Sequence, residues 1–253
     1  TMFKRAAVVS VGAMAVLAGA DDPMAVRVAA DTLGRGTERM GANQRKGLGY
    51  IADVTDAAQL AQAYKDAKAS VRHQANVEKA VVKSSSVLFG SPEAAAKQLS
   101  AFEPLIEARA DALLNEVTAT FKLAAETWKT PTTEPLPTEL EKQAARLVVE
   151  RVPPPAGAAS GAGGGPGGGF GGPQNREVAA AMQKIPQHMR SELNPLLGRK
   201  MTATEIRDFL TGEFEPVPLE DVMNYLRAVE KAGTIKLTER PEAPKPGSRA
   251  RKP

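Results

Sequence analysis

The stretch PLEDVMNYLRAVEKAGTIKLT, residues 218–238, contains the clearest local structure signals in the chain. Val222, Tyr225, Leu226 and Val229 recur at the spacing of one helix face. Acidic residues occupy the first turn and a lysine occupies the last, where the helix dipole favours each of them. A glycine then supplies a left-handed stop, and TIKLT alternates as a short strand. The stretch therefore predicts a helix, a tight stop and a strand.

The residues before this stretch predict more helices. Segments 175–184 and 187–193 are two helical pieces separated by a proline. Thr202 and Glu205 form a capping box that begins a third helix, which should end near residue 213. These elements and the stretch above predict one small helical module.

The module resembles the winged helix-turn-helix superfamily. The run LRAVEKAGTIKL, residues 226–237, is similar to the end of the third helix of that superfamily and its entry into a wing strand. The resemblance covers residues 174–238 and implies a winged-helix-like module over 174–240. Residues 240–244, RPEAP, cannot easily continue a strand ladder, so we expect a truncated wing.

The charge of this module argues against nucleic-acid binding. Residues 174–240 contain ten Lys/Arg and ten Asp/Glu, whereas duplex binding depends on several contacts between cations and phosphates. Glu220 and Asp221 lie at the helix end that would meet base edges. We therefore expect a protein-docking module, with Tyr225 and Leu226 as its possible docking face. A nucleic-acid-associated winged-helix protein of the cytosol or an organelle is the alternative.

Residues 153–173 predict a flexible linker before this module. Ten of the seventeen residues from 156 to 172 are glycine, and no charge interrupts them. Such a segment can bury almost nothing and has high backbone entropy. Residues 241–253 are rich in proline and basic residues, and predict a disordered tail.

Residues 21–152 predict a helical domain, either an Ala-rich bundle or an elongated hairpin. The helix starts are marked by Thr55, by the pair Ser91-Pro92 and by the capping box Thr138/Glu141. The last of these helices is expected to run to about Arg151.

Residues 34–49 contain five glycines and predict a basic loop. Its cations Arg35, Arg39, Arg45 and Lys46 could contact an anion or an acidic partner, or could simply keep an exposed loop soluble. A dinucleotide fingerprint is incomplete here, because Arg39 stands where its third glycine belongs.

Residues 1–20 predict a signal or targeting segment. Lys4-Arg5 precede an apolar run over 6–20, and the small residues Ala18 and Ala20 precede Asp21. We expect cleavage before Asp21 and export to the periplasm or outside the cell. An uncleaved segment that associates the chain with a membrane or an organelle, and a buried N-terminal helix, are the alternatives. We expect no span in the mature chain, since no second apolar run reaches spanning length.

The composition restricts the chemistry. The chain has no cysteine, and its two histidines, His73 and His188, lie in different regions, so we predict no metal, cofactor or catalytic residues. Aromatic residues make up only 4%, which favours helices with small side chains. We therefore expect a mainly α, non-catalytic interaction or scaffold protein that binds a protein partner; an uncharacterised enzyme is the remaining alternative.

Overall fold

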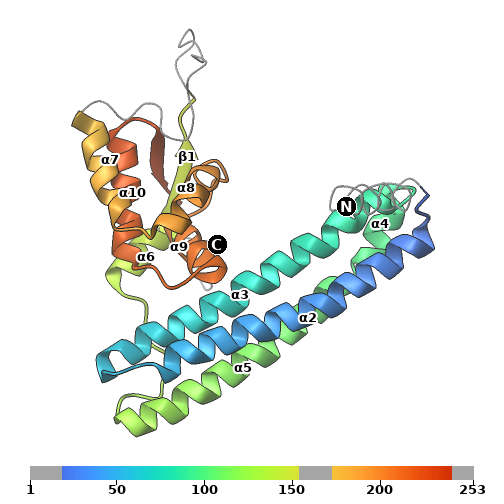
Figure 1. The fold of residues 1–253 in the computed structure, drawn as a ribbon, viewed down its shortest axis with the longest axis horizontal. Coiled ribbons are helices and arrows are strands. Elements are labelled where there is room, and N and C mark those ends of the chain that lie inside the picture. Colours follow the sequence, from blue (N-terminus) through green and yellow to red (C-terminus); the bar gives the residue numbers. More distant parts are fainter. Residues whose placement is uncertain (1–18, 154–172, 241–253) are drawn as a thin grey trace, which may run out of the picture. The chain divides into compact units, whose positions relative to one another are not determined.

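The computed structural model describes residues 19–153 and 173–240, and these residues are mainly helical, as predicted. The described strands form one two-stranded sheet. The chain divides into two compact units, Thr1–Thr133 (unit 1) and Glu134–Pro253 (unit 2) (Figure 1). The predicted leader up to residue 18, most of the predicted linker and the tail from residue 241 lie outside the described residues.

Unit 1 is built on three long helices that pack against one another pairwise (Figure 1). Its elements are α2 (Asp22–Ala52), η1 (Ala57–Gln59), α3 (Leu60–Ser84), η2 (Ser85–Leu88), α4 (Pro92–Leu99) and α5 (Phe102–Trp128). Much of the core is alanine, and its largest anchor is Tyr64, whose ring stacks on Phe121 at 4.3 Å between centroids.

The predicted loop over residues 34–49 is wrong, because these residues lie within the continuous helix α2. The glycines have a packing reason at two positions. A Cβ at Gly36 would lie 2.6 Å from Oε2 of Glu78, and one at Gly47 would lie 2.9 Å from Cα of Ala67. Both neighbours belong to α3: Gly47 lets the backbones of the two helices approach closely, and Gly36 leaves room for the buried Glu78 carboxylate.

The helix starts in unit 1 follow the sequence in part. The Ser91 hydroxyl accepts a hydrogen bond from the Ala94 amide at 3.1 Å and caps α4, with Pro92 in the first turn, as predicted. Thr55 is not a cap, because the Asp56 side chain caps η1 instead, at 3.1 Å from the Ala58 amide.

Unit 2 contains short helices and the two strands. Its elements are α6 (Glu139–Arg146), β1 (Leu147–Arg151), α7 (Pro173–Gln183), η3 (Gln187–Met189), α8 (Arg190–Leu196), α9 (Ala203–Glu213), α10 (Leu219–Lys231) and β2 (Ile235–Glu239). The capping boxes at Thr138 and Thr202 are both present. Gly233 adopts a φ of +77° after α10, so the predicted left-handed stop is confirmed.

Two expectations about this unit are wrong. The helix that starts at Thr138 ends at Arg146 and gives way to β1, instead of continuing to Arg151. The strand β2 is not left without a partner, because β1 pairs with it antiparallel over five residues, from Leu147 opposite Glu239 to Arg151 opposite Ile235. The partner of β2 thus comes from before the glycine-rich segment and not from the residues that follow β2.

Consequently α6 and β1 pack with the second unit. The boundary between the units lies at residues 133 and 134, whereas the sequence analysis placed the end of the N-terminal domain at residue 152.

Candidate functional site

The four cations predicted as an anion or partner contact lie along α2 and are not gathered into one site. Arg35 pairs with Asp31 at 2.9 Å, one turn earlier on the same helix. Arg39 donates two hydrogen bonds, of 2.8 and 2.6 Å, to the carboxylate of Glu78 on α3. Arg45 is exposed and Lys46 is half-buried. The charges of Arg35 and Arg39 are thus already matched by carboxylates.

The Arg39–Glu78 pair belongs to a polar network between α2 and α3. The Glu78 side chain is 1% exposed, and it also accepts a hydrogen bond from Gln74, which in turn bonds Asn43. The hydrogen bond to Glu78 raises the pKa of Arg39 above its ordinary value. A carboxylate buried at this depth needs such partners, so we assign the network a structural role in fixing how the two helices pack.

A groove of about 720 Å³ opens at the end of unit 1 where α3, η2, α4 and the start of α5 meet. This volume falls in the range of ligand sites. Its walls are chiefly apolar and are made by Ala80, Val82, Val87, Phe89, Gly90, Pro92, Ala95, Ala96, Leu99 and Ile106. The polar and charged lining residues are Lys79, Lys83, Ser86, Ser91, Ser100 and Glu103.

Two features of the groove bear on what it can bind. Val87 is 83% exposed, which is unusual for an apolar side chain within a concave surface. Lys79 is paired with Glu107. Lys83 is exposed and forms no ion pair with any residue in the described part of the chain. The groove therefore combines an apolar wall with the charged residues Lys79, Lys83 and Glu103, of which Lys79 is paired with Glu107 outside the lining. The sequence analysis missed it, since its residues come from four elements without a shared motif.

The predicted processing residues stand at the start of unit 1. Ala18 lies outside the described residues, and Ala20 precedes α2 without belonging to it. Asp21 is the N-cap of α2, and its carboxylate accepts a hydrogen bond from the Met24 amide at 2.9 Å. The next carboxylate, on Asp22, accepts from the amide of Gly90 at 2.9 Å, which ties the start of α2 to the groove wall.

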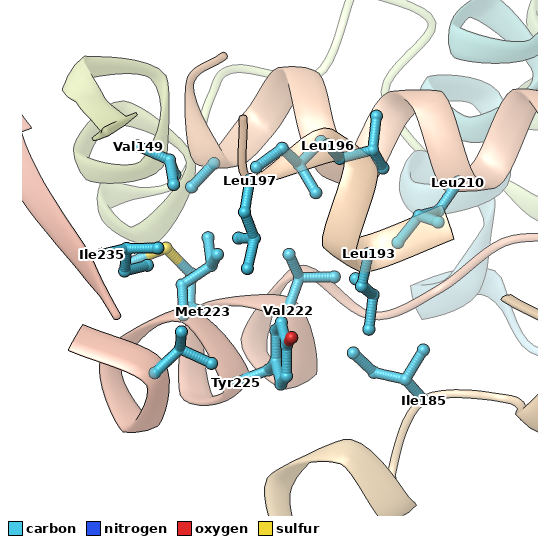
Figure 2. Packing of buried hydrophobic residues seen from close by; sticks show 14 of the residues in the cluster. Val149, Ile185, Leu193, Leu196, Leu197, Leu210, Val222, Met223, Tyr225 and Ile235 are labelled. Atoms are coloured by element: carbon cyan, nitrogen blue, oxygen red, sulfur yellow. The ribbon is translucent and has the colours of Figure 1, made fainter. Parts of the chain in front are cut away.

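The predicted docking face on α10 is wrong, because Tyr225 and Leu226 are core residues that are 4% and 0% exposed. Figure 2 shows Tyr225 among Val222, Met223 and the other apolar side chains of unit 2. Burial raises the pKa of Tyr225 to about 12.

The rest of α10 is also largely covered. The helix contacts α7, α9, α6 and β2. Lys231 near its end pairs with Glu177 of α7 at 2.8 Å, and Arg227 donates to Gln143 of α6 at 3.2 Å. At its start Asp221 lies 3.8 Å from Lys184, just after α7. The helix is thus held between its neighbours instead of presenting a continuous face.

The strand β1 is bonded on both sides. It forms the ladder with β2 on one side, and on the other the Val149 amide donates to the Met201 carbonyl at 2.9 Å, beside a bridge between Val148 and Thr202. The β-branched pair Val148-Val149 was the sequence signal for this strand. The sequence analysis had instead extended the helix that begins at Thr138 through these two residues.

No helix in residues 19–153 or 173–240 is both long and apolar enough to cross a membrane. The same residues contain no group of three or more His, Asp or Glu placed to hold a metal ion. No protein-family model, curated protein or solved structure matches the chain.

Proposed function

We propose that this chain is a non-catalytic interaction protein and that the groove of unit 1 binds an amphipathic helix of a partner protein. The observation that carries the proposal is the apolar groove with Val87 exposed in its wall. An apolar helix face laid into such a groove is a common mode of peptide recognition. The same geometry accounts for an exposed valine beside a concave surface, since a docked helix would cover it.

The charge at the rim defines the partner further. Lys83 would meet an acidic residue on the polar flank of the docked helix, because an unmatched cation beside a docked apolar face favours a carboxylate there. The partner is therefore a protein helix with an apolar face and at least one carboxylate beside it.

The geometry of unit 2 disfavours nucleic-acid reading, which is the alternative to protein docking. The proposed winged-helix likeness is supported by the order of α9, α10 and β2, with β1 as the second strand. In that likeness α10 would be the reading helix. Since α7 and α6 both contact α10, its residues are poorly placed to enter a groove of a duplex.

Export is also part of the proposal. Cleavage before Asp21 would leave the N-cap of α2 in place, so the folded chain would begin at the predicted cleavage site. N-terminal sequencing of the protein from its native host tests this point: a chain that starts at Asp21 supports it, and a chain that retains Met2 contradicts it.

The groove is tested by a photocrosslinking amino acid placed at position 87 of the full chain in its native host. The matched position is Leu123, which is 66% exposed on α5. We expect a discrete adduct from position 87 and none from position 123. The adduct from position 87 should be lost with Lys83→Glu. It should be retained with Lys122→Glu, which makes the same change of charge at an exposed site on α5. The crosslinked segment should be an amphipathic helix bearing a carboxylate. The same adducts from both positions, or an adduct indifferent to Lys83→Glu, would contradict the proposal.

A further inference from the structure

Unit 2 contains a segment that completes its core from a distant part of the chain. Within residues 139–151, Ala144 and Val149 are 0% exposed and Leu147 is 9% exposed, and all three belong to the apolar core of the unit. The rest of that core comes from residues 178–235. Figure 2 shows Val149 of this segment facing the same interior as Ile235 and Met223. We call residues 139–151 the clip, and residues 173–240 its receptor.

The clip is recognised by backbone as well as by apolar contacts. On the β2 side it forms five residue pairs, and on the other side it meets residues 201 and 202. Beyond the ladder, the Val152 amide donates to the Thr234 carbonyl at 3.0 Å, and the Arg240 amide donates to the Arg146 carbonyl at 2.8 Å. The receptor therefore contacts the backbone of the clip along the whole of β1.

Polar side chains add further pairings between the two pieces. Arg151 donates to Asn194 at 3.1 Å, and Lys200 lies 3.7 Å from Glu150. A short segment held by a ladder on one side, an isolated bridge on the other, buried side chains and such pairs has the contacts of a bound ligand.

The covalent connection between the clip and its receptor is not a hairpin turn. The ends of β1 and β2 that such a turn would join, at Arg151 and Ile235, are not joined directly, because residues 152–234 lie between them. The clip is linked to its receptor through residues 154–172, which are rich in glycine. Loop-closure entropy rises only slowly with length, so the contacts of the clip do not depend strongly on which chain it belongs to.

We propose that the receptor is a binding site for the clip, and that a second copy of this chain can supply it, giving a dimer by segment exchange. Exchange of an identical element preserves each contact described above and needs no new surface. The closed monomer is favoured until the protein concentration approaches the effective concentration of the tethered clip, on the order of 1 mM. The inference concerns unit 2 and stands apart from the groove of unit 1.

The first test uses the full chain with a protease site placed within residues 154–172. After cleavage, we expect the two pieces to co-elute at the mass of the intact chain and to separate only in denaturant. Pieces that separate under native conditions would overturn the proposal, because the receptor would then not hold the clip without the covalent link.

The second test asks whether another copy can supply the clip. Tagged and untagged intact chains are refolded together at rising concentration, and dimers that contain both are measured. We expect their fraction to rise steeply towards the millimolar range, to vanish with Ala144→Asp and to persist with Ala145→Asp, the same change at the exposed neighbour. No mixed dimer at any concentration, or equal dimer with Ala144→Asp, would overturn exchange. The cleavage test keeps the proposal open to refutation if Ala144→Asp prevents unit 2 from folding.

Discussion

The cores of the two units differ in the size of the side chains they bury. Unit 1 packs its long helices at small residues, with a glycine of α2 against Ala67 of α3 and alanines at many core positions. Unit 2 buries mainly Leu, Ile, Val and Met around α10. Close helix approach makes unit 1 sensitive to added atoms, whereas a core of large side chains makes unit 2 sensitive to removed ones.

The largest expected effect is the loss of a large side chain from unit 2. Leu226→Ala should destabilise unit 2 by about 4 kcal/mol, since Leu226 is fully buried and its removal leaves a cavity. Unit 1 should be unaffected, and Trp128, the single tryptophan, reports its unfolding separately. Circular dichroism and Trp128 fluorescence in denaturant measure the two transitions. As the control, Leu136→Ala at a site 85% exposed should change stability by less than about 0.5 kcal/mol.

The next effect breaks the polar link between two helices of unit 1. Arg39→Ala should cost about 3 kcal/mol, because it leaves the buried Glu78 carboxylate without its charge partner. Arg35→Ala removes an equal charge from an exposed pair and should cost at most about 1 kcal/mol. Equal losses from the two variants, measured by Trp128 fluorescence in denaturant, would show that the buried network does not support unit 1.

A pH effect should be confined to unit 2. Folding raises the pKa of Tyr225 from 10.0 to about 12, so the neutral phenol is favoured in the folded state. The stabilisation is complete below pH 10 and is lost as the pH rises from 10 through about 12, to a total of about 3 kcal/mol. Unfolding of the wild type and of Tyr225→Phe is compared across this range, together with the ultraviolet absorbance of tyrosinate. A phenol that ionises near pH 10 in the folded chain would contradict the buried position of Tyr225.

The smallest effect tests close approach in unit 1. Gly47→Ala should destabilise unit 1 by about 2 kcal/mol, since the new Cβ would lie 2.9 Å from Cα of Ala67. Gly41→Ala, with no atom within 4 Å of the new Cβ, should instead stabilise the helix by about 0.5–1 kcal/mol. Thermal unfolding of both variants checks the opposite signs, and a loss from both would mean that helix α2 does not extend through these glycines.

The sequence predicted the elements whose signals are local. Ser91, Thr202 and Gly233 fix helix ends through their own hydrogen bonds or backbone angle, and all three were found where expected. The predicted loop around Gly36 and Gly47 failed because the reason for those glycines lies on another helix.

The partner of β2 and the candidate site could not be predicted from local sequence signals either, because both depend on contacts between distant parts of the chain. The pairing of Val148 with Thr238 joins residues on opposite sides of the glycine-rich segment, and no periodicity reports such a contact. The groove at Val87 is likewise a meeting of four elements, so its existence depends on how the helices pack. Buried Tyr225 was assigned to a surface because helix spacing alone does not show which faces are covered.

We expect unit 2 to unfold as one cooperative body that includes β1, which comes from before residues 154–172. Native-state hydrogen exchange on the full chain tests it most directly, by comparing the Val149 amide, which donates to Met201, with the Ile206 amide, which donates to Thr202 at the start of α9. We expect the same opening free energy for both amides, and the same loss for both in Ala144→Asp, with no change in unit 1. A Val149 amide that exchanges freely while Ile206 stays protected would contradict it.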